Sequence, residues 1–248
     1  MLKGLLKLSW IETKIFLREP LGVVGTLGMP VILFLLLGKA LRASPRLSSR
    51  PFSQFPVNIT IVAAILIALG AVQSLVAIMA IYREGGILKR LRATPLSPVT
   101  ILGAHVLVKL GFTATSLVLL NVAGKRVLPG ALPYNMLAFS GAVMLGTLSI
   151  LSLGFLLASV VRTARFAQPF GAAVMYPMLA ISGLFFPVAS LPLALRVIAY
   201  LLPTTHAVAL MQGVWDGASW STQAGNIAAL LALFAIFITL SARWFRWE

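Results

Sequence analysis

The chain alternates between long apolar runs and short polar breaks, and this pattern predicts membrane-spanning helices. Six runs approach the roughly twenty apolar residues that a helix needs to cross a bilayer. They extend from Leu21 to Leu41, Val57 to Ile81, Val99 to about Val122, Tyr134 to Val161, about Ala167 to Phe186, and Gln223 to Trp244. Pro30 and Pro177 lie inside the first and fifth runs and predict a kink in each.

Two further segments are apolar without having the length or uniformity of a span. Residues 1–19 carry apolar side chains on one helical face and Lys3, Lys7 and Lys14 toward the other, which predicts an amphipathic elbow helix lying in the membrane surface and ending at Pro20. Residues 187–221 are broken by prolines into pieces too short to cross. We expect them to form helices that dip into the outer leaflet and return.

The composition supports a membrane protein and removes several kinds of chemistry. Sixty per cent of the residues are hydrophobic and ten per cent are charged, whereas about a quarter are charged in soluble domains. The chain has no cysteine, which excludes disulfides and cysteine-based metal sites. Its five acids are scattered without the spacing of a catalytic pair or a metal cage. We therefore predict no metal site and no catalytic residues.

The net charge of +15 reflects topology rather than nucleic-acid binding, because the basic residues lie at the edges of the apolar runs. The positive-inside rule predicts both termini in the cytoplasm. We expect a multi-pass protein of the cell inner (plasma) membrane. The residues then predicted inside are Lys3, Lys7, Lys14, Arg18, Arg83, Lys89, Arg90, Arg92, Arg162, Arg165, Arg243 and Arg246. Those predicted outside are Lys39, Arg42, Arg46, Arg50, Lys125, Arg126 and Arg196.

One predicted cytoplasmic segment, "YREGGILKRLRATPLSP" from Tyr82 to Pro98, forms a cluster of charge between two spans. Its pattern predicts a short helix that begins after Gly85 and Gly86 and ends before Pro95, with leucines and isoleucine on one face and basic residues on the rest. Such a segment is either a basic loop that anchors topology or a helix whose apolar face docks against a partner.

The segment closely resembles the "E-R-E-x-G-T-L-x-x-L-x-x-T-P-L" stretch of ABC-2 type transporter permeases. In this sequence Tyr82 replaces the first acid, which removes one salt bridge to the ATPase or to the elbow helix, and Ile87 replaces the threonine. Three other stretches resemble the same family in the same order. They are "FLREPLGVVGTLGMPVILFLLLG" near the first span, "SGLFFPVASLP" after the fifth, and "YLLPTTHAVALMQG" beyond it.

The resemblance implies an all-α membrane protein with an amphipathic N-terminal elbow, six spans, a cytoplasmic coupling helix over residues 83–97, and an outer re-entrant helical pair before the last span. Residues 1–248 would form a single transmembrane domain. It also implies a permease subunit of an ABC exporter whose coupling helix docks on a cytoplasmic ATPase. The implied coupling residues are Arg83, Glu84, Gly86, Leu88, Lys89, Arg90, Leu91, Arg92, Thr94 and Pro95.

The chain has no G-x-x-x-x-G-K-[ST] loop to bind nucleotide phosphates. We therefore expect no cofactor in this chain, with ATP and Mg bound by the partner ATPase. The expected partners are two ATPase subunits, membrane lipid, and a second permease that is either an identical or a similar copy.

The resemblance places the substrate path between two permease copies, lined by the second and fifth spans. The candidates are Gln73, Ser74, Phe170, Met175, Tyr176, Met178, Phe185 and Phe186. Aromatic and methionine side chains repack around varied shapes, which suits an apolar or amphipathic drug, lipid or lipid-linked glycan. The same residues would also serve as ordinary packing.

Lys109 and His105 lie one turn apart on the third predicted span. Either they make polar contacts inside a transport cavity, or the span begins well inside the cytoplasm and Lys109 reaches the inner interface. For His206 we expect a capping or interface role in the outer segment.

Three alternatives to an ABC permease stay open. A secondary transporter usually needs acids inside its spans or an internal repeat, and the six runs contain no Asp or Glu. A membrane-embedded enzyme needs a catalytic cluster that His105, Lys109 and His206 do not form in sequence. A non-transporting membrane scaffold that recruits an ATPase is the third alternative, and only a transport assay distinguishes it from an ABC permease.

Overall fold

The computed structural model describes residues 2–18, 20–43, 58–87, 98–127, 135–161 and 163–244, and within these ranges all regular structure is helical. The elements are α1 (Leu2–Leu17), α2 (Pro20–Val23), η1 (Val24–Gly28), α3 (Met29–Ala43), α5 (Ile59–Glu84), α7 (Pro98–Val127), α8 (Met136–Val160), α9 (Ala164–Ala180), η3 (Val188–Ser190), α10 (Leu193–Tyr200), α11 (Pro203–Trp215) and α12 (Ala224–Trp244). The prediction of an all-α protein is thus confirmed for this part of the chain.

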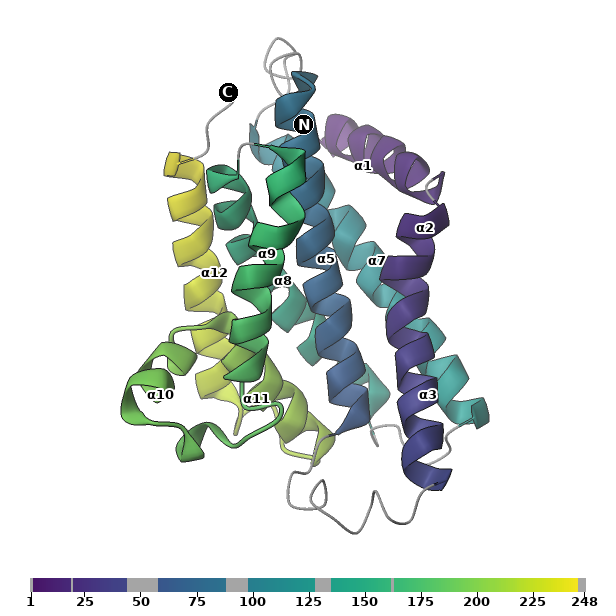
Figure 1. Ribbon diagram of the computed structural model, residues 1–248, viewed down its shortest axis with the longest axis vertical. Helices are drawn as coiled ribbons and strands as arrows, with labels where there is room; N and C mark the ends of the chain where they lie inside the picture. Colours follow the sequence, from purple (N-terminus) through teal and green to yellow (C-terminus); the bar gives the residue numbers. More distant parts are fainter. Residues whose placement is uncertain are drawn as a thin grey trace.

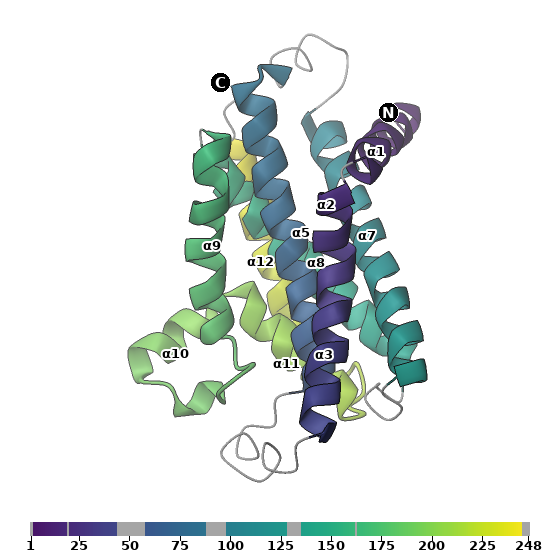
Figure 2. The ribbon, with the colours of Figure 1, turned by 45° about the vertical axis from the view of Figure 1, so that its right-hand side comes forward.

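Helix α5 is the central element of the bundle. It packs against α3, α7, α8, α9 and α11, and it runs between α9 and α3 in Figures 1 and 2. Apolar side chains cover it on all sides, as expected for a helix surrounded by protein, and Ala64, Val72 and Leu75 are completely buried. The Asn58 side chain accepts hydrogen bonds from the backbone N–H groups of Thr60 and Ile61, so this residue caps the start of α5.

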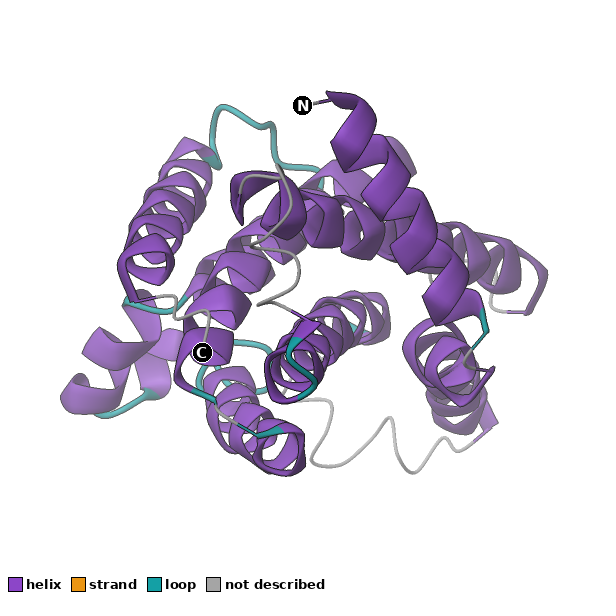
Figure 3. Cartoon of the chain, turned by 90° about the horizontal axis from the view of Figure 1, so that it is seen from above, coloured by secondary structure: helices purple, strands orange, loops and turns teal. Residues whose placement is uncertain are grey.

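The two ends of the bundle carry different accessory helices. Helix α1 lies across the end where α5 finishes and α9 begins, whereas α10 and η3 lie at the opposite end (Figure 1). Seen from above, α1 is viewed from the side while most of the long helices are viewed along their axes (Figure 3). The end of α12 lies on the same side of the bundle as α1 (Figure 1), so the described parts near both termini share one face.

Four described helices are long and apolar enough to cross a membrane: Thr60–Glu84, Gly103–Val127, Met136–Val160 and Ala224–Arg243. Helices α10 and α11 form a pair bent by 80°, which makes a fifth span only if the pair is one broken span. The structure therefore supports four to five spans, and the division into six stays a prediction.

The predicted first span is not a uniform α-helix. The π-helix η1 separates α2 from α3, just before Pro30. A π-helical turn inserts an extra residue and often lies at a functional site. The apolar helix that runs from Val24 to Ala40 has fewer residues than the four long ones.

The predicted fifth span ends earlier than the apolar pattern indicates. Helix α9 contains Pro177 and stops at Ala180, so Phe185 and Phe186 lie in the turn beyond it. Gly183 there has φ of 88°, a left-handed conformation that favours glycine and ends the helix. Composition could not reveal this end because the turn is as apolar as the helix.

The outer segment, predicted over residues 187–221, contains η3, α10 and α11. His206 of α11 connects it to its neighbours: Nδ1 is 3.1 Å from Asn226 Oδ1 at the start of α12, and Nε2 is 3.0 Å from the Tyr200 carbonyl oxygen at the end of α10. The hydroxyl of Thr204 donates to the Met178 carbonyl of α9 at 3.4 Å. Helix α11 is thus joined to α9, α10 and α12 by polar contacts.

A first prediction concerns Gly154, where α8 passes close to α5. A Cβ at this position would lie 3.0 Å from Val72 Cγ1 and 3.3 Å from Leu75 Cδ2. We expect Gly154→Val to separate the helices and lower the free energy of unfolding by about 1–3 kcal/mol. Gly111→Val on α7 is the matched control, because nothing lies within 4 Å of a Cβ there. Thermal unfolding in detergent checks this, and equal melting temperatures for the two variants would contradict close packing at Gly154.

Candidate functional site

A polar cavity of about 370 Å³ lies between α1, η1, α5, α7 and α9. Its polar lining residues come from all five of these elements: Glu12, Thr26, Gln73, Ser74, His105, Lys109 and Gln168. Apolar residues, among them Ile15, Phe16 and Ile81, complete the wall. So many polar groups in a predominantly apolar protein make this cavity the candidate functional site.

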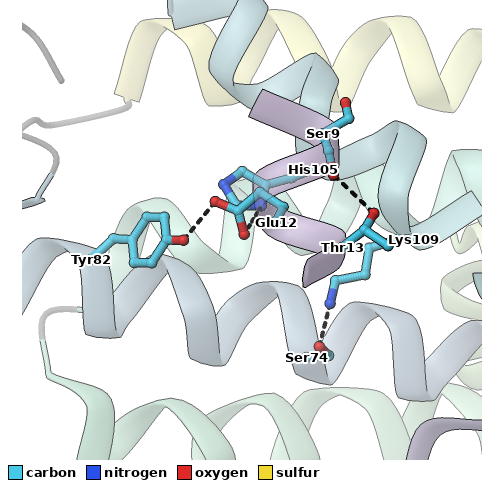
Figure 4. A network of polar contacts seen from close by, with 7 residues as sticks. All are labelled: Ser9, Glu12, Thr13, Ser74, Tyr82, His105 and Lys109. Carbon is cyan, nitrogen blue, oxygen red and sulfur yellow. Dashed lines mark hydrogen bonds and ion pairs between the residues drawn. The ribbon is translucent and has the colours of Figure 1, made fainter. Parts of the chain in front are cut away.

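Glu12 of α1 is the acid of the cavity, and only 6% of its surface is exposed. The Tyr82 hydroxyl of α5 donates a hydrogen bond to Glu12 Oε1 at 2.5 Å, and His105 Nδ1 of α7 lies 3.7 Å from Oε2 (Figure 4). The Tyr82 and His105 rings also meet edge to face, with 5.7 Å between their centroids. Glu12 therefore connects α1 to two helices of the bundle.

Burial raises the pKa of the Glu12 carboxyl above its ordinary 4.5. The hydrogen bond from Tyr82 and the positive charge of Lys109 act in the opposite direction, but the loss of water around the carboxylate outweighs them. Folding thus makes protonation of Glu12 easier than it is in water.

Lys109 of α7 points into the same cavity, with 5% of its surface exposed. Its ammonium group donates to Ser74 Oγ of α5 and lies 5.2 Å from the centre of the Phe16 ring of α1. Lys109 thus makes a polar contact inside a cavity, and its depth relative to the membrane interface stays a prediction. His105, four residues earlier, lies on the same helical face.

Helices α5 and α9 approach closely at the predicted path residue Gln73. A Cβ on Gly171 of α9 would lie 2.3 Å from Gln73 Oε1, so a larger residue there would require the Gln73 amide to move. Gln73 also lines a second space of about 330 Å³, together with Met29, Met175 and Tyr176. Gln73 therefore borders both spaces.

The other predicted path residues are more scattered. Met175 and Met178 are buried, and Phe170 packs against Phe166 with 5.4 Å between the ring centroids. Tyr176, by contrast, is 62% exposed. The structure brings Gln73 and Ser74 together in the polar cavity and joins Gln73 to Met175 and Tyr176 in the second space.

The predicted coupling segment starts inside α5, which continues through Glu84. Arg83 and Glu84 do not extend away from the bundle. Arg83 Nη1 donates to the Ala158 carbonyl at 2.9 Å and to the Val161 carbonyl, and Glu84 Oε2 accepts from the Ala164 amide at 2.8 Å. Gly86 follows with φ of 65°. The remaining predicted coupling residues, Leu88, Lys89, Arg90, Leu91, Arg92, Thr94 and Pro95, lie outside the described residues.

The replacement of an acid by Tyr82 was expected to remove one salt bridge to the ATPase or to the elbow helix. The structure places a hydrogen bond at this position, because the phenol donates to Glu12 of α1. A hydroxyl donor facing an acid keeps the two elements connected without a salt bridge. Glu12 and Gln168 had not been predicted as site residues, and the only signal for Glu12 was an acid within an amphipathic, otherwise basic helix.

The described residues contain no group of three or more His, Asp or Glu side chains that could hold a metal ion.

Most of the chain matches one known protein family. The family model described as ABC-2 type transporter matches residues 4–215. This chain belongs to the ABC-2 type transporter family. The permease is also similar to the inner membrane transport permease YhhJ of Escherichia coli (strain K12) and to the protein of the same name from Shigella flexneri, each 28% identical over 196 residues. The match covers 76% of this chain and 49% of each relative, so the permease spans about half the length of the curated relatives it matches.

The family and the apolar helices together identify a multi-pass membrane protein of the ABC-2 permease class. In general, permeases of this family work with ATPase partners. The cavity and the polar contacts at the end of α5 are therefore parts of a transport permease.

A second prediction follows from the raised pKa of Glu12. A raised pKa means that the stability contributed by the protonated acid is fully present below the ordinary value of 4.5 and is lost as the pH rises through the raised value. We expect Glu12→Gln, which keeps an acceptor for Tyr82, to become more stable relative to the unsubstituted permease as the pH rises over this window. Melting temperatures of both proteins across pH check this, and a difference that does not change with pH would contradict it.

Proposed function

We propose that this permease is the membrane-spanning subunit of an ATP-driven exporter that moves an apolar or amphipathic substrate outward. Separate ATPase subunits would act on it through residues 83–97. Drugs, lipids and lipid-linked glycans are the substrate classes that fit the mixed lining. Both chain termini and the 83–97 segment would face the cytoplasm.

One observation carries this proposal: the segment that resembles a coupling helix continues directly from the most central helix of the bundle. Helix α5 ends at Glu84, most of its side chains are buried, and α3, α7, α8, α9 and α11 pack against it. A displacement of residues 83–97 would therefore reach the core through a continuous helix. Because packed helices resist compression, such a displacement would be passed on rather than absorbed.

The energy source would be outside this chain. The sequence contains no phosphate-binding loop, so ATP and Mg would be bound by the partner ATPases. Two ATPase subunits and a second permease, identical or similar, would complete the exporter. The exposed face of Tyr176, Met29 and Leu33, which line the second space, offers apolar surface for the second permease or for substrate.

The polar cavity supports the amphipathic class of substrate. Lys109, Gln73 and Ser74 offer charge and hydrogen bonds within it, and Ile15 and Ile81 add partly exposed apolar surface to its wall. A molecule with a polar head and an apolar tail matches both parts, whereas a purely ionic substrate matches only one.

A third prediction tests the docking of the ATPase. We expect the double charge reversal Arg90→Glu with Arg92→Glu to weaken binding of the ATPase by about tenfold or more, as loss of close charge pairs across an interface does. The matched control is Lys125→Glu with Arg126→Glu, two exposed residues at the far end of α7. Co-purification and substrate-stimulated ATP hydrolysis measure the effect.

Three outcomes are informative for this test. Loss of binding in the first double variant alone supports the proposed function. Equal assembly and coupling in both would contradict a docking role for residues 83–97. Transport that persists with a hydrolysis-deficient ATPase and follows an ion gradient would favour a secondary transporter instead.

A further inference from the structure

The last turn of α5 faces the junction between α8 and α9. Helix α8 ends at Val160 and α9 begins at Ala164, so only a few residues separate them. Both helices pack against α5. The junction is therefore the place where a displacement of the α5 end would reach two further helices together.

Arg83 binds the end of α8. The last carbonyl groups of a helix lack partners within that helix and carry partial negative charge. Arg83 Nη1 donates to two of them, the Ala158 carbonyl at 2.9 Å and the Val161 carbonyl just beyond the helix. The guanidinium therefore supplies both hydrogen bonds and a favourable charge at this terminus.

Glu84 binds the start of α9. The residue that precedes this helix, Thr163, makes no capping hydrogen bond with its side chain. Instead, Glu84 Oε2 accepts from the Ala164 amide at 2.8 Å, across 80 residues of sequence. A carboxylate is the group that the positive end of a helix favours, so Glu84 acts as a cap supplied by another helix.

We propose that Arg83 and Glu84 are positioning residues that make the end of α5, the end of α8 and the start of α9 move as one body. This inference rests on the proposed function, because it describes how a displacement of residues 83–97 is passed on. Without the two contacts, α5 would move past the α8–α9 junction. With them, α9 follows.

Movement of α9 has a direct consequence for the cavity. Helix α9 contributes Gln168 to its wall, and Gly171 lies against Gln73. A shift at the start of α9 would therefore change the space around Gln73, which also borders the second space with Tyr176. The contacts of Arg83 and Glu84 thus connect the ATPase-facing end of α5 to the residues predicted for the substrate path.

The order of the two charges makes the inference specific. The α8 carbonyls need a donor and the Ala164 amide needs an acceptor, so exchanging the residues leaves both termini with the wrong partner. We expect the exchanged variant Arg83→Glu with Glu84→Arg to transport less than either Arg83→Met or Glu84→Ala. The conservative variants Arg83→Lys and Glu84→Gln each keep a group that suits the helix end, so they should retain part of the transport.

The first measurement needs no partner. Hydrogen–deuterium exchange at the Ala164 amide should accelerate by roughly tenfold in Glu84→Ala, as expected for a lost cap. Tyr82→Phe is the matched control, because it removes a neighbouring contact to α1 and leaves the Ala164 amide bonded.

The second measurement follows α9 in the assembled exporter. The permease has no cysteine of its own, so spin labels at Phe166→Cys and Ala242→Cys report the distance between α9 and α12 without background labelling of this chain. We expect nucleotide to shift this distance in the otherwise unsubstituted permease. In Arg83→Met and Glu84→Ala we expect the shift and transport to be lost, and co-purification of the ATPase with each variant separates this loss from a loss of docking.

The outcomes separate the inference from the proposed function. Slow exchange at Ala164 in Glu84→Ala, or a normal shift and transport in both variants, would overturn the inference. A fully active exchanged variant would overturn it as well. If the unsubstituted permease binds no ATPase, the proposed function fails, and the exchange measurement still decides whether Glu84 holds the start of α9.

Discussion

Three consecutive residues at the end of α5 join this helix to three different elements, and the site depends on that arrangement. Successive residues of a helix point about 100° apart, so neighbours in sequence face different directions. Tyr82 bonds to Glu12 of α1, Arg83 to the end of α8, and Glu84 to the start of α9. Because α5 is also the central helix, its end fixes the position of α1 and of the α8–α9 junction relative to the core.

The apolar surroundings explain why these polar groups cluster. Within a bilayer a charged or polar side chain finds little water, so it is stable only near protein partners. Lys109 meets Ser74 and the Phe16 ring, and Glu12 meets Tyr82 and His105. Their contacts cross between α1, α5 and α7, and the same need for partners therefore assembles the cavity wall and attaches α1 to the bundle.

The apolar pattern of the sequence predicted α5, α7, α8 and α12 to within a few residues, because each is long and uniformly apolar. It failed at the end of α9, where the turn is as apolar as the helix, and it did not reveal the π-helical turn before Pro30. Within the site, the motif identified Arg83 and Glu84 but not their roles. Their partners are backbone groups 75 to 80 residues away, and a backbone carbonyl or amide has no signature in sequence.

The helices that the end of α5 holds in place also line the cavity. Under the proposed function, this has a thermodynamic consequence. Tyr82 holds α1, which contributes Glu12 and Phe16 to the cavity, and Glu84 holds α9, which contributes Gln168. Coupling between two sites is reciprocal: if closure of the ATPases changes the affinity of the cavity, an occupant changes the equilibrium of closure by the same factor. Stimulation of hydrolysis by substrate then needs no element beyond α5, α1 and α9. The strength of this stimulation would depend on how differently an occupant contacts Lys109 and Gln73 before and after α9 moves. Only a difference in binding affinity between two states can shift the equilibrium between them.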